Sequence, residues 1–381
     1  MTGVDAVEVA IVGGGPAGAA AALALARAGR AVLLLEKDQI AAFKIGEALP
    51  PAVKPLLRDL GVWERFVADG HLPCYANLSA WGSDSLQSAD FINDPNGRGW
   101  HLDRPRFDAF LRAEARAAGA DVRAGSSIQA YEWQPVRQEW ALTLEDGDRV
   151  RSQWLVDASG RRSIVARQQG IRRQADDALV GIYALFQPPS HSQGSDRDSS
   201  TLIESGPDGW WYTARVPSGQ RVVVYLTDAD LLSRAARTQP GFQALVTTTR
   251  HIRARLAEHG YRLGEAPKGV AAQSARLERF GGEGWLAIGD AALSFDPLSS
   301  QGILTALYTG MTAGQALHAH FSGEGLALEA YSERLATIYE VYLRNRDLCY
   351  AAETRWLDRP FWHRRIGERA RARYPDSRDS D

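Results

Sequence analysis

The sequence predicts an α/β protein in which a parallel sheet covered by helices is combined with an inserted antiparallel sheet and a C-terminal helical region. Three observations predict this architecture. The first 36 residues alternate an apolar run, a glycine-rich turn, an Ala/Leu-rich segment and a second apolar run. Residues 180–227 contain short strand-like runs separated by turn residues, and residues 302–354 contain two long helical segments.

The N-terminal segment has the pattern of a strand–helix–strand unit. Residues 7–12 (VEVAIV) are a nearly continuous apolar run, as expected for a strand covered on both faces. Residues 17–29 are rich in Ala and Leu and end at a glycine, a residue that commonly stops a helix. Residues 31–36 (AVLLLE) have the pattern of a second buried strand. Two such strands joined by a helix predict a parallel pair.

The remaining elements follow from the same periodicities and from the positions of turn residues. Helices are expected at 51–69, 105–118, 241–260, 302–321 and 326–354. Strands are expected at 121–124, 127–133, 139–145, 149–157, 180–186, 200–204, 210–216, 221–227 and 285–289. The polar segment 187–200 is expected to be a loop, and the arginine-rich tail beyond residue 366 a frayed end.

We expect these elements to form three regions. The first domain is discontinuous and comprises residues 1–75, 101–165 and 276–325. An inserted substrate domain comprises residues 76–100 and 166–275, and a C-terminal helical region comprises residues 326–381.

Composition and charge exclude several classes of function. The net charge is −2, so no nucleic-acid partner is expected, and no apolar run is long enough to predict a membrane span. Asp5 and Glu8 stand where a signal peptide would be basic. Cys74 and Cys349 form neither a CxxC pair nor a zinc-ligand spacing, so neither a disulfide framework nor a metal site is expected. These features predict a cytoplasmic protein.

The turn after the first strand carries the motif Gly13-x-Gly15-x-x-Gly18 at the start of a helix. In such motifs the first glycine permits a tight turn, the second lets the backbone approach a diphosphate, and the third lets helix and strand pack closely. The helix N-terminus, at Pro16 and Ala17, offers unpaired N–H groups to phosphate oxygens. Glu36, followed by Lys37, ends the second strand, where an acid binds ribose hydroxyls. This pattern predicts a dinucleotide but does not separate FAD from NAD.

A second motif makes that distinction. Residues 285–303 read WLAIGDAALSFDPLSSQGI, and this segment resembles the flavin-dependent monooxygenase and halogenase superfamily. The resemblance implies that the first domain is an FAD-binding, Rossmann-like domain. It also implies that Asp290 binds the ribityl chain, that the loop from Pro297 borders the isoalloxazine, and that Gly302 and Ile303 open a helix facing the pyrimidine end.

Two further positions match that superfamily. Arg104, in the segment LDRPRFD, matches an arginine that touches the cofactor phosphates, and Asp157, in the segment DASGRRS, matches a segment that helps to hold FAD. Only one GxGxxG motif is present. We therefore expect the flavin to be reduced by transiently docked NAD(P)H or by a separate flavin reductase.

The sequence departs from the halogenase pattern of the superfamily. Halogenases carry W-x-W-x-I-P, whereas this chain has Trp210-Trp211-Tyr212 without the following Ile-Pro. They also use a lysine to carry the halogen, but residues 55–100 contain no lysine, and Asn77 is the nearest equivalent. Ser299 replaces the glutamate of the tryptophan-type halogenases. Hydroxylation is therefore favoured over halogenation.

Hydroxylation in this superfamily uses O2, which reacts with the reduced flavin to give an electrophilic C4a-hydroperoxide. The protein must keep this adduct dry and hold an electron-rich aromatic ring beside it. Glu47, Tyr212 and His101 are the candidate catalytic residues. The aromatic side chains available for the substrate pocket are Trp81, Trp100, His101, Trp210, Trp211 and Tyr212.

Several stretches resemble one subgroup, the flavoprotein maturases of tryptophylquinone-containing oxidases. They are residues 46–51, 79–83, 99–104 and 355–362. This resemblance implies that the substrate is a tryptophan side chain of a partner oxidase, and that the C-terminal region with Trp356 and Trp362 contributes a docking surface. Three alternatives stay open: a flavin reductase similar to geranylgeranyl reductase, a halogenase, and a flavin-binding assembly chaperone without catalysis.

Overall fold

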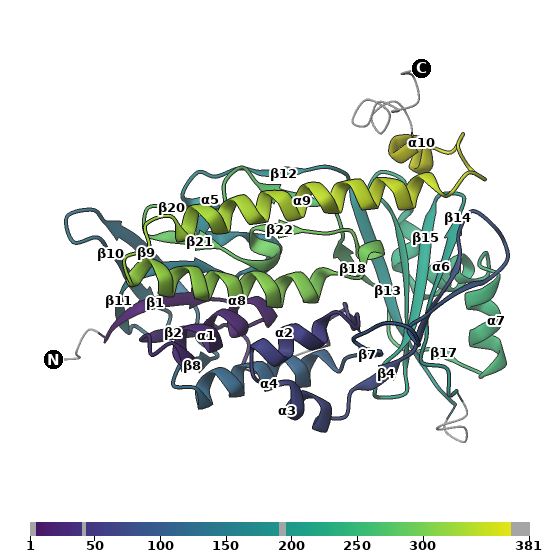
Figure 1. Cartoon of the computed structure of the whole chain (residues 1–381). Coiled ribbons are helices and arrows are strands. Elements are labelled where there is room, and N and C mark those ends of the chain that lie inside the picture. The colour runs from purple at the N-terminus through teal and green to yellow at the C-terminus, as the bar shows by residue number, and fades with distance from the viewer. Residues whose placement is uncertain (1–4, 40–42, 190–195, 367–381) are drawn as a thin grey trace, which may run out of the picture.

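The computed structural model describes residues 5–39, 43–189 and 196–366, and its overall arrangement is shown in Figure 1. The predicted fold class is confirmed: the described residues form a mainly parallel sheet with helices, a mainly antiparallel sheet, and helices at the C-terminal end. The domain limits themselves stay a prediction. No helix of the described residues is long and apolar enough to cross a bilayer.

The first sheet provides the edge at which the glycine motif lies. Its parallel strands run in the order β21-β11-β1-β2-β8. Their bounds are β1 Asp5–Val12, β2 Val32–Glu36, β8 Asp121–Ala124, β11 Arg149–Asp157 and β21 Trp285–Ala287. All five residues of β2 and most of the neighbouring side chains are buried, because both faces of the sheet are covered. Because these strands are parallel, the carboxyl ends of β1, β11 and β21 lie at the same edge of the sheet.

Two helices that begin at this edge pack closely side by side. They are α1 (Pro16–Arg27) and α8 (Gly302–Phe321). A Cβ atom added to Gly310 would lie 2.1 Å from the carbonyl oxygen of Ala17, so only glycine permits this helix spacing. The close packing brings the N-termini of both helices to the same end of the sheet. On the neighbouring side, α4 (Arg104–Ala117) begins at Asp103, whose side chain accepts the N–H of Arg106.

The second sheet runs in the order β17-β13-β16-β15-β14-β5-β6, with β18 also paired to β13. Its strands are β5 Ala76–Ala80, β6 Gln87–Asp90, β13 Leu179–Gln187, β14 Thr201–Gly206, β15 Gly209–Arg215, β16 Arg221–Asp228, β17 Arg262–Leu263 and β18 Lys268–Ala271. Trp211, Phe242 and Ile252 are buried where helices cover one face. Trp210, Tyr350 and Trp362 are buried on the other face. Residues 190–195 of the predicted loop lie outside the described residues.

The remaining strands either extend the first sheet or form two three-stranded sheets. They are β3 Ala48–Leu49, β4 Leu72–Cys74, β7 Gly99–His101, β9 Ile128–Gln134, β10 Glu139–Leu144, β12 Arg173–Ala175, β19 Ala275–Leu277, β20 Gly281–Gly282 and β22 Leu293–Ser294. The helix α9 (Ala327–Ala351) lies along the top of Figure 1 and links the two sheets, and α10 (Pro360–Ile366) follows it. The tail beyond residue 366 lies outside the described residues.

Two predicted helices are each broken into two. Residues 51–69 form α2 (Val53–Asp59) and α3 (Trp63–Ala68), because Gly61 between them has φ +61°. Residues 241–260 form α6 (Gln239–Val246) and α7 (His251–Glu258). The buried carboxylate of Glu204 accepts the N–H groups of His251 and Ile252, each at 3.0 Å, and so caps the second helix from a distant strand. Helix periodicity does not reveal such a tertiary cap.

Candidate active site

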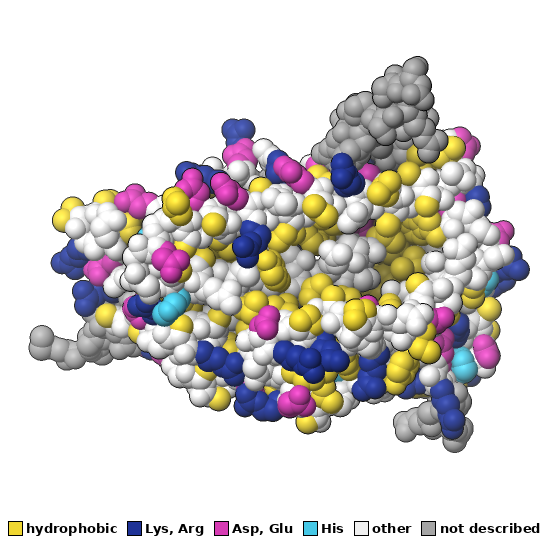
Figure 2. Space-filling model, in the orientation of Figure 1, with side chains coloured by type: hydrophobic (Ala, Val, Ile, Leu, Met, Phe, Trp, Pro, Cys, Tyr) yellow, Lys and Arg dark blue, Asp and Glu magenta, His cyan; other side chains and the backbone are white. Residues whose placement is uncertain are grey.

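A cavity of about 630 Å³ lies between the two sheets. Figure 2 shows a hollow lined by hydrophobic side chains on this face of the molecule. Gly15, Ala17, Asp290, Gly302 and Ile303 line the half of the cavity next to the first sheet. Tyr183, Ile203, Trp210, Tyr212, Val224 and Leu226 line the half next to the second sheet. One continuous space therefore joins the glycine motif to an apolar, aromatic-walled chamber.

The three glycines of the motif have different structural roles. Gly13 has φ +114°, and a Cβ atom there would lie 2.3 Å from the carbonyl oxygen of Ala158. A Cβ atom on Gly18 would lie 1.9 Å from the carbonyl oxygen of Gly13. A Cβ atom on Gly15 would meet nothing within 4 Å, and the φ of Gly15 is −72°. Gly13 and Gly18 are thus required by the fold, whereas Gly15 leaves space open in the cavity wall for a ligand.

The N-termini of α1 and α8 both face this half of the cavity. Neither helix has a side chain that caps its first N–H groups, and Pro16 and Gly302 at the two starts line the cavity. Uncapped N–H groups and the positive end of each helix dipole attract the negatively charged or oxygen-rich parts of a ligand. Pro297 and Ile303, on either side of the start of α8, also line the cavity.

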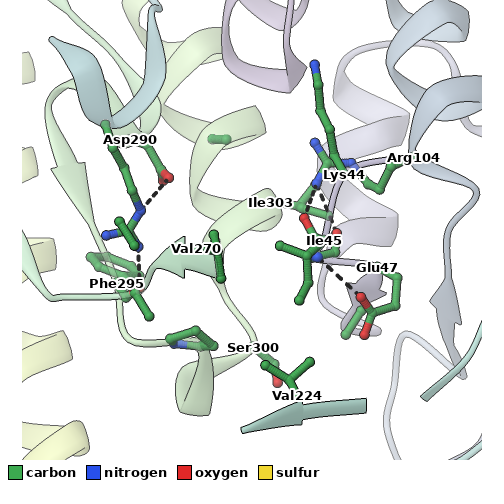
Figure 3. A pocket seen from close by; sticks show the side chains of 18 of the residues that line it. Lys44, Ile45, Glu47, Arg104, Val224, Val270, Asp290, Phe295, Ser300 and Ile303 are labelled. Carbon is green, nitrogen blue, oxygen red and sulfur yellow. Dashed lines mark hydrogen bonds and ion pairs between the residues drawn. The ribbon is translucent and has the colours of Figure 1, made fainter. Parts of the chain in front are cut away.

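Asp290 lies on the opposite side of the cavity from Glu47, as Figure 3 shows. Its carboxylate pairs with Arg161 at 3.4 Å, and its side chain is 39% exposed. Arg161 also donates to the carbonyl oxygens of Gln273 and Phe295, so the guanidinium is fixed. Asp290 is therefore held in place while an oxygen atom of its carboxylate stays accessible to hydroxyl groups of a ligand.

Arg104 lines the cavity, but its guanidinium is already engaged. It donates to both carboxylate oxygens of Asp108, at 3.2 and 3.3 Å, and to the carbonyl oxygen of Gly46 at 3.0 Å. Arg112, which sequence reasoning missed, donates to the carbonyl oxygen of Gly14 at 3.0 Å. Arg104 thus shapes the wall by holding the segment around Gly46, and a direct phosphate contact stays a prediction.

Besides Gly13 and Gly18, three predicted cofactor residues do not line the cavity. Glu36 is buried below the glycine turn and accepts the N–H groups of Gly14 and Asp38. Lys37 is exposed and lies 3.9 Å from Asp38. Asp157 is buried and accepts four hydrogen bonds, from the N–H and hydroxyl of Ser159 and from the N–H groups of Val165 and Ala166. Their visible roles are structural, and their contacts with a cofactor stay predictions.

Glu47 and Tyr212 both line the cavity. Burial raises the pKa of Glu47 from its ordinary value of 4.5 to about 7, although the N–H groups of Glu47 and Gly46 and the charge of Arg104 lower it. Burial, followed by the nearby Glu47 carboxylate, raises the pKa of Tyr212 well above its usual range. A carboxyl group with a pKa near neutrality can exchange a proton with a substrate at physiological pH.

His101, the third predicted catalytic residue, is not brought into the cavity. It is fully buried, its Nδ1 lies 2.9 Å from the carbonyl oxygen of Arg215, and its Nε2 lies 2.9 Å from the hydroxyl of Thr201. Burial lowers the pKa of His101 to about 4. The imidazole is thus neutral and fully engaged behind the wall that Thr201 lines, and its visible role is to join β7 to the second sheet.

The aromatic residues expected in the substrate pocket separate into two groups. Trp210 and Tyr212 line the cavity. Trp100 packs in the hydrophobic core beside the first sheet, Trp211 stacks on Tyr225 on the other face of the second sheet, and Trp81 lies against Trp362. Side chains alternate along β15, so adjacent Trp210 and Trp211 point to opposite faces.

The expected docking role of Trp362 is wrong. Its side chain is fully buried and its indole donates to the carbonyl oxygen of Gly206 at 2.9 Å. Trp356 is half-buried and lies under the guanidinium of Arg355. The apolar sheet face attracts the terminal helix because its aromatic residues would otherwise be exposed. The segment 355–362 is therefore mainly a support for the second sheet.

The residues that line the cavity fit FAD. Gly15 and two uncapped helix N-termini suit a diphosphate and the pyrimidine ring, and Asp290 suits a polyol chain. No group of three or more His, Cys, Asp or Glu side chains suited to a metal ion occurs in residues 5–39, 43–189 and 196–366.

Comparison with known proteins agrees with this geometry. The profile of the FAD binding domain family matches residues 6–345, so the chain belongs to this family. It is an FAD-dependent oxidoreductase. LodB of Marinomonas mediterranea, named as an FAD-dependent oxidoreductase, is 30% identical over 95% of this chain and 97% of its own length.

Relatives and solved structures include halogenases and hydroxylases. A pyrrole-carbonyl carrier-protein brominase of Pseudoalteromonas luteoviolacea is 26% identical, over 88% of this chain and 82% of its own. The flavin-dependent halogenase CmlS has a TM-score of 0.81 at 24% identity, covering 95% of this chain and 68% of its own. The peptidyl tryptophan dihydroxylase QhpG has a TM-score of 0.73 at 24% identity, covering 97% of this chain and 80% of its own. The two structures share the fold of this chain.

Replacing Asp290 with alanine is expected to weaken FAD binding about 10- to 100-fold, because a hydrogen bond to a charged group contributes about 1.5–3 kcal/mol. The dissociation constant is measured by titrating apoprotein with FAD. Glu132→Ala, an exposed carboxylate on β9 that does not line the cavity, is the control and should bind FAD like the wild-type protein. Equal affinities in the two variants would contradict the role of Asp290.

Proposed function

We propose that this protein is an FAD-dependent monooxygenase that hydroxylates an electron-rich aromatic group, and that this group is a tryptophan side chain of a partner polypeptide. The observation that carries the proposal is the continuity of the cavity. The half that fits FAD opens directly into a chamber walled by Trp210, Tyr212 and aliphatic side chains, with the buried carboxyl group of Glu47 in its wall.

The chemistry divides between the cofactor and the chain. Bound and reduced FAD supplies the activation of O2 and an electrophilic oxygen atom. Val224, Leu226 and Ile203 give the chamber an apolar wall that excludes water, which protects this chemistry from loss to solvent. Trp210 and Tyr212 offer ring edges and faces against which an aromatic substrate packs.

Glu47 is assigned as the general base. Adding an electrophilic oxygen to an aromatic ring requires the ring to lose a proton, and the carboxylate of Glu47 accepts it at an Oε atom. Gly46 N–H donates to Oε2 of Glu47 at 3.2 Å, and Glu47 lines the cavity. A pKa near 7 matches a base that works at neutral pH.

The positions of the lysines favour hydroxylation over halogenation. Of the four lysines in the chain, only Lys44 lines the cavity, and its amino group lies 3.7 Å from Asp108 beside Arg104. In Figure 3 its side chain points away from Glu47. Asn77, the position compared with the halogenase lysine, is not among the cavity-lining residues. The chamber with Trp210 and Tyr212 thus lacks the amine that halogenases use.

The proposal also covers the source of electrons, the cellular compartment and the class of substrate. Electrons come from a separate flavin reductase or from transiently docked NAD(P)H, since one glycine motif serves one dinucleotide. The free thiols of Cys74 and Cys349 suit a reducing cytoplasm. The hydroxylase QhpG, which shares this fold, acts on a peptidyl tryptophan, and this supports the same class of substrate here.

The test uses the FAD-loaded protein, a flavin reductase with NADH, O2, and a tryptophan-containing peptide or partner-oxidase polypeptide. We expect O2-dependent gain of oxygen on the tryptophan, and no product from the same peptide with phenylalanine in its place. Bromination in the presence of bromide would identify a halogenase. Saturation of a prenyl alkene without O2 would identify a reductase, and bound FAD that never turns over would identify an assembly chaperone.

A further inference from the structure

The cavity has two walls that belong to different sheets, and a single hydroxyl group connects them. Asp296 begins the loop that borders the flavin half, and Trp210 lies in the wall of the chamber. The hydroxyl of Tyr350 donates to Oδ2 of Asp296 at 2.7 Å and accepts the indole N–H of Trp210 at 3.1 Å. Tyr350 itself does not line the cavity.

The helix that carries Tyr350 is suited to hold both walls. Tyr342, two turns earlier on α9, accepts the backbone N–H of Asp296 at 2.7 Å and stacks on Phe295 with ring centroids 4.1 Å apart. Arg346, between the two tyrosines, donates to Asp177 at 3.1 Å. One face of α9 therefore binds both the backbone and the carboxylate of the residue that opens the flavin loop.

The ring of Tyr350 is fixed independently of its hydroxyl. It is 1% exposed and packs between Trp81, Phe361 and Trp362, with ring centroids 6.0–6.1 Å away. The guanidinium of Arg365 lies 5.1 Å from the ring centroid. Removal of the hydroxyl alone would leave these contacts in place, so its effect on the cavity can be measured in a folded protein.

We propose that Tyr350 is a positioning residue whose hydroxyl fixes the substrate wall at Trp210 relative to the flavin loop at Asp296. The terminal helices thereby set the width of the chamber in front of the flavin. This inference rests on FAD occupying the cavity and not on the identity of the substrate. Among the described residues, the Tyr350 hydroxyl forms hydrogen bonds only with Asp296 and Trp210, and both bonds are buried.

The test compares FAD-loaded Tyr350→Phe with the wild-type protein, without substrate. We expect unchanged FAD affinity, a shifted flavin absorption band, and increased quenching of the bound flavin by iodide, because the wall loosens. The matched control is Tyr331→Phe, which removes a buried hydroxyl on the same helix that donates to the carbonyl oxygen of Ala287. This control should match the wild-type protein in both readouts.

Two further variants keep the test decisive. Asp296→Asn keeps a single carbonyl oxygen, which cannot accept both the Tyr350 hydroxyl and the Leu298 N–H, and so should shift the spectrum and the quenching as Tyr350→Phe does. Trp210→Phe cuts the link from the other side, and it decides the question if Tyr350→Phe does not fold. Wild-type spectra and quenching in the folded Tyr350→Phe, or in Trp210→Phe if the first does not fold, would overturn the proposal. If the wild-type protein does not hydroxylate tryptophan while Tyr350→Phe shows the expected shift and quenching, only the proposed function is contradicted.

Discussion

Replacing Gly15 with valine is expected to give a folded but colourless protein. The backbone at Gly15 has an ordinary φ of −72°, and an added Cβ atom meets no protein atom within 4 Å. The valine side chain therefore fits the fold but occupies the space in which the cofactor diphosphate approaches the start of α1. FAD affinity should fall by about 1,000-fold or more, measured by titration of apoprotein and by absorbance of the purified protein.

The matched control for this variant is Gly325→Val. Gly325 lies in the exposed turn between α8 and α9, and an added Cβ atom there also meets nothing within 4 Å. Both proteins should have the circular dichroism spectrum of the wild type, and only Gly325→Val should be yellow. Normal flavin absorbance in Gly15→Val would refute the assignment of the diphosphate site.

Replacing Glu47 with glutamine is expected to lower the hydroxylation rate about 100- to 1,000-fold, because the amide cannot accept the proton that the substrate loses. The wild-type rate should rise with pH through about 7, since the deprotonated carboxylate is the active form. The variant should lose this rise. The measurement is the initial rate of product formation from pH 5 to pH 9 with FAD saturating.

The raised pKa of Glu47 also predicts that the stability of the folded protein falls with pH, whereas the reaction rate rises. Between pH 4.5 and about 7 the carboxyl group of Glu47 is protonated in the folded protein but ionised in the unfolded chain. Unfolding then releases a proton, so stability falls as pH rises through this interval, by about 3 kcal/mol in total. The gain in thermal stability of Glu47→Gln over the wild type should therefore be larger at pH 8 than at pH 5. Glu114→Gln, a buried glutamate paired with Arg65 outside the cavity, should not reproduce this pattern.

An unchanged pH profile in Glu47→Gln would contradict the role of Glu47 as a base. A lower rate with an unchanged profile would instead indicate that Glu47 shapes the chamber.

Much of the fold is predictable from the sequence because its main signals are local. The run VEVAIV, the glycine turn and the Ala/Leu-rich segment specify a strand, a turn and a helix through neighbouring residues. The helix breaks at Gly61 and before His251 were missed because hydrophobic periodicity does not reveal what causes them. The first depends on a left-handed residue and the second on the carboxylate of Glu204, which lies on a strand distant in sequence.

The candidate site is predictable only where a motif covers it. Gly15, Asp290 and Gly302 lie in quoted motifs, and all three line the cavity. The contributions of Arg161 and Tyr350 depend on which segments the fold brings together. A signal for Arg161 did exist, since it stands in the segment DASGRRS. No local pattern marks Tyr350 as a link between a loop and a strand.

His101 shows the limit of reasoning from residue type. A histidine beside Trp100 is a reasonable catalytic candidate in sequence, yet both of its nitrogens are engaged behind the cavity wall. Residue types suited to catalysis are also suited to bridging buried strands, and only the position relative to the cavity separates the two roles.

The most direct test of the account is the fate of isotopically labelled O2. The FAD-loaded protein is reduced, mixed with a tryptophan-containing peptide and exposed to the labelled gas, and the peptide is analysed by mass spectrometry. We expect labelled oxygen on the tryptophan ring of the peptide that was treated with the wild-type protein. Oxygen derived from water, or labelled hydrogen peroxide as the sole product with an authentic partner polypeptide present, would contradict it.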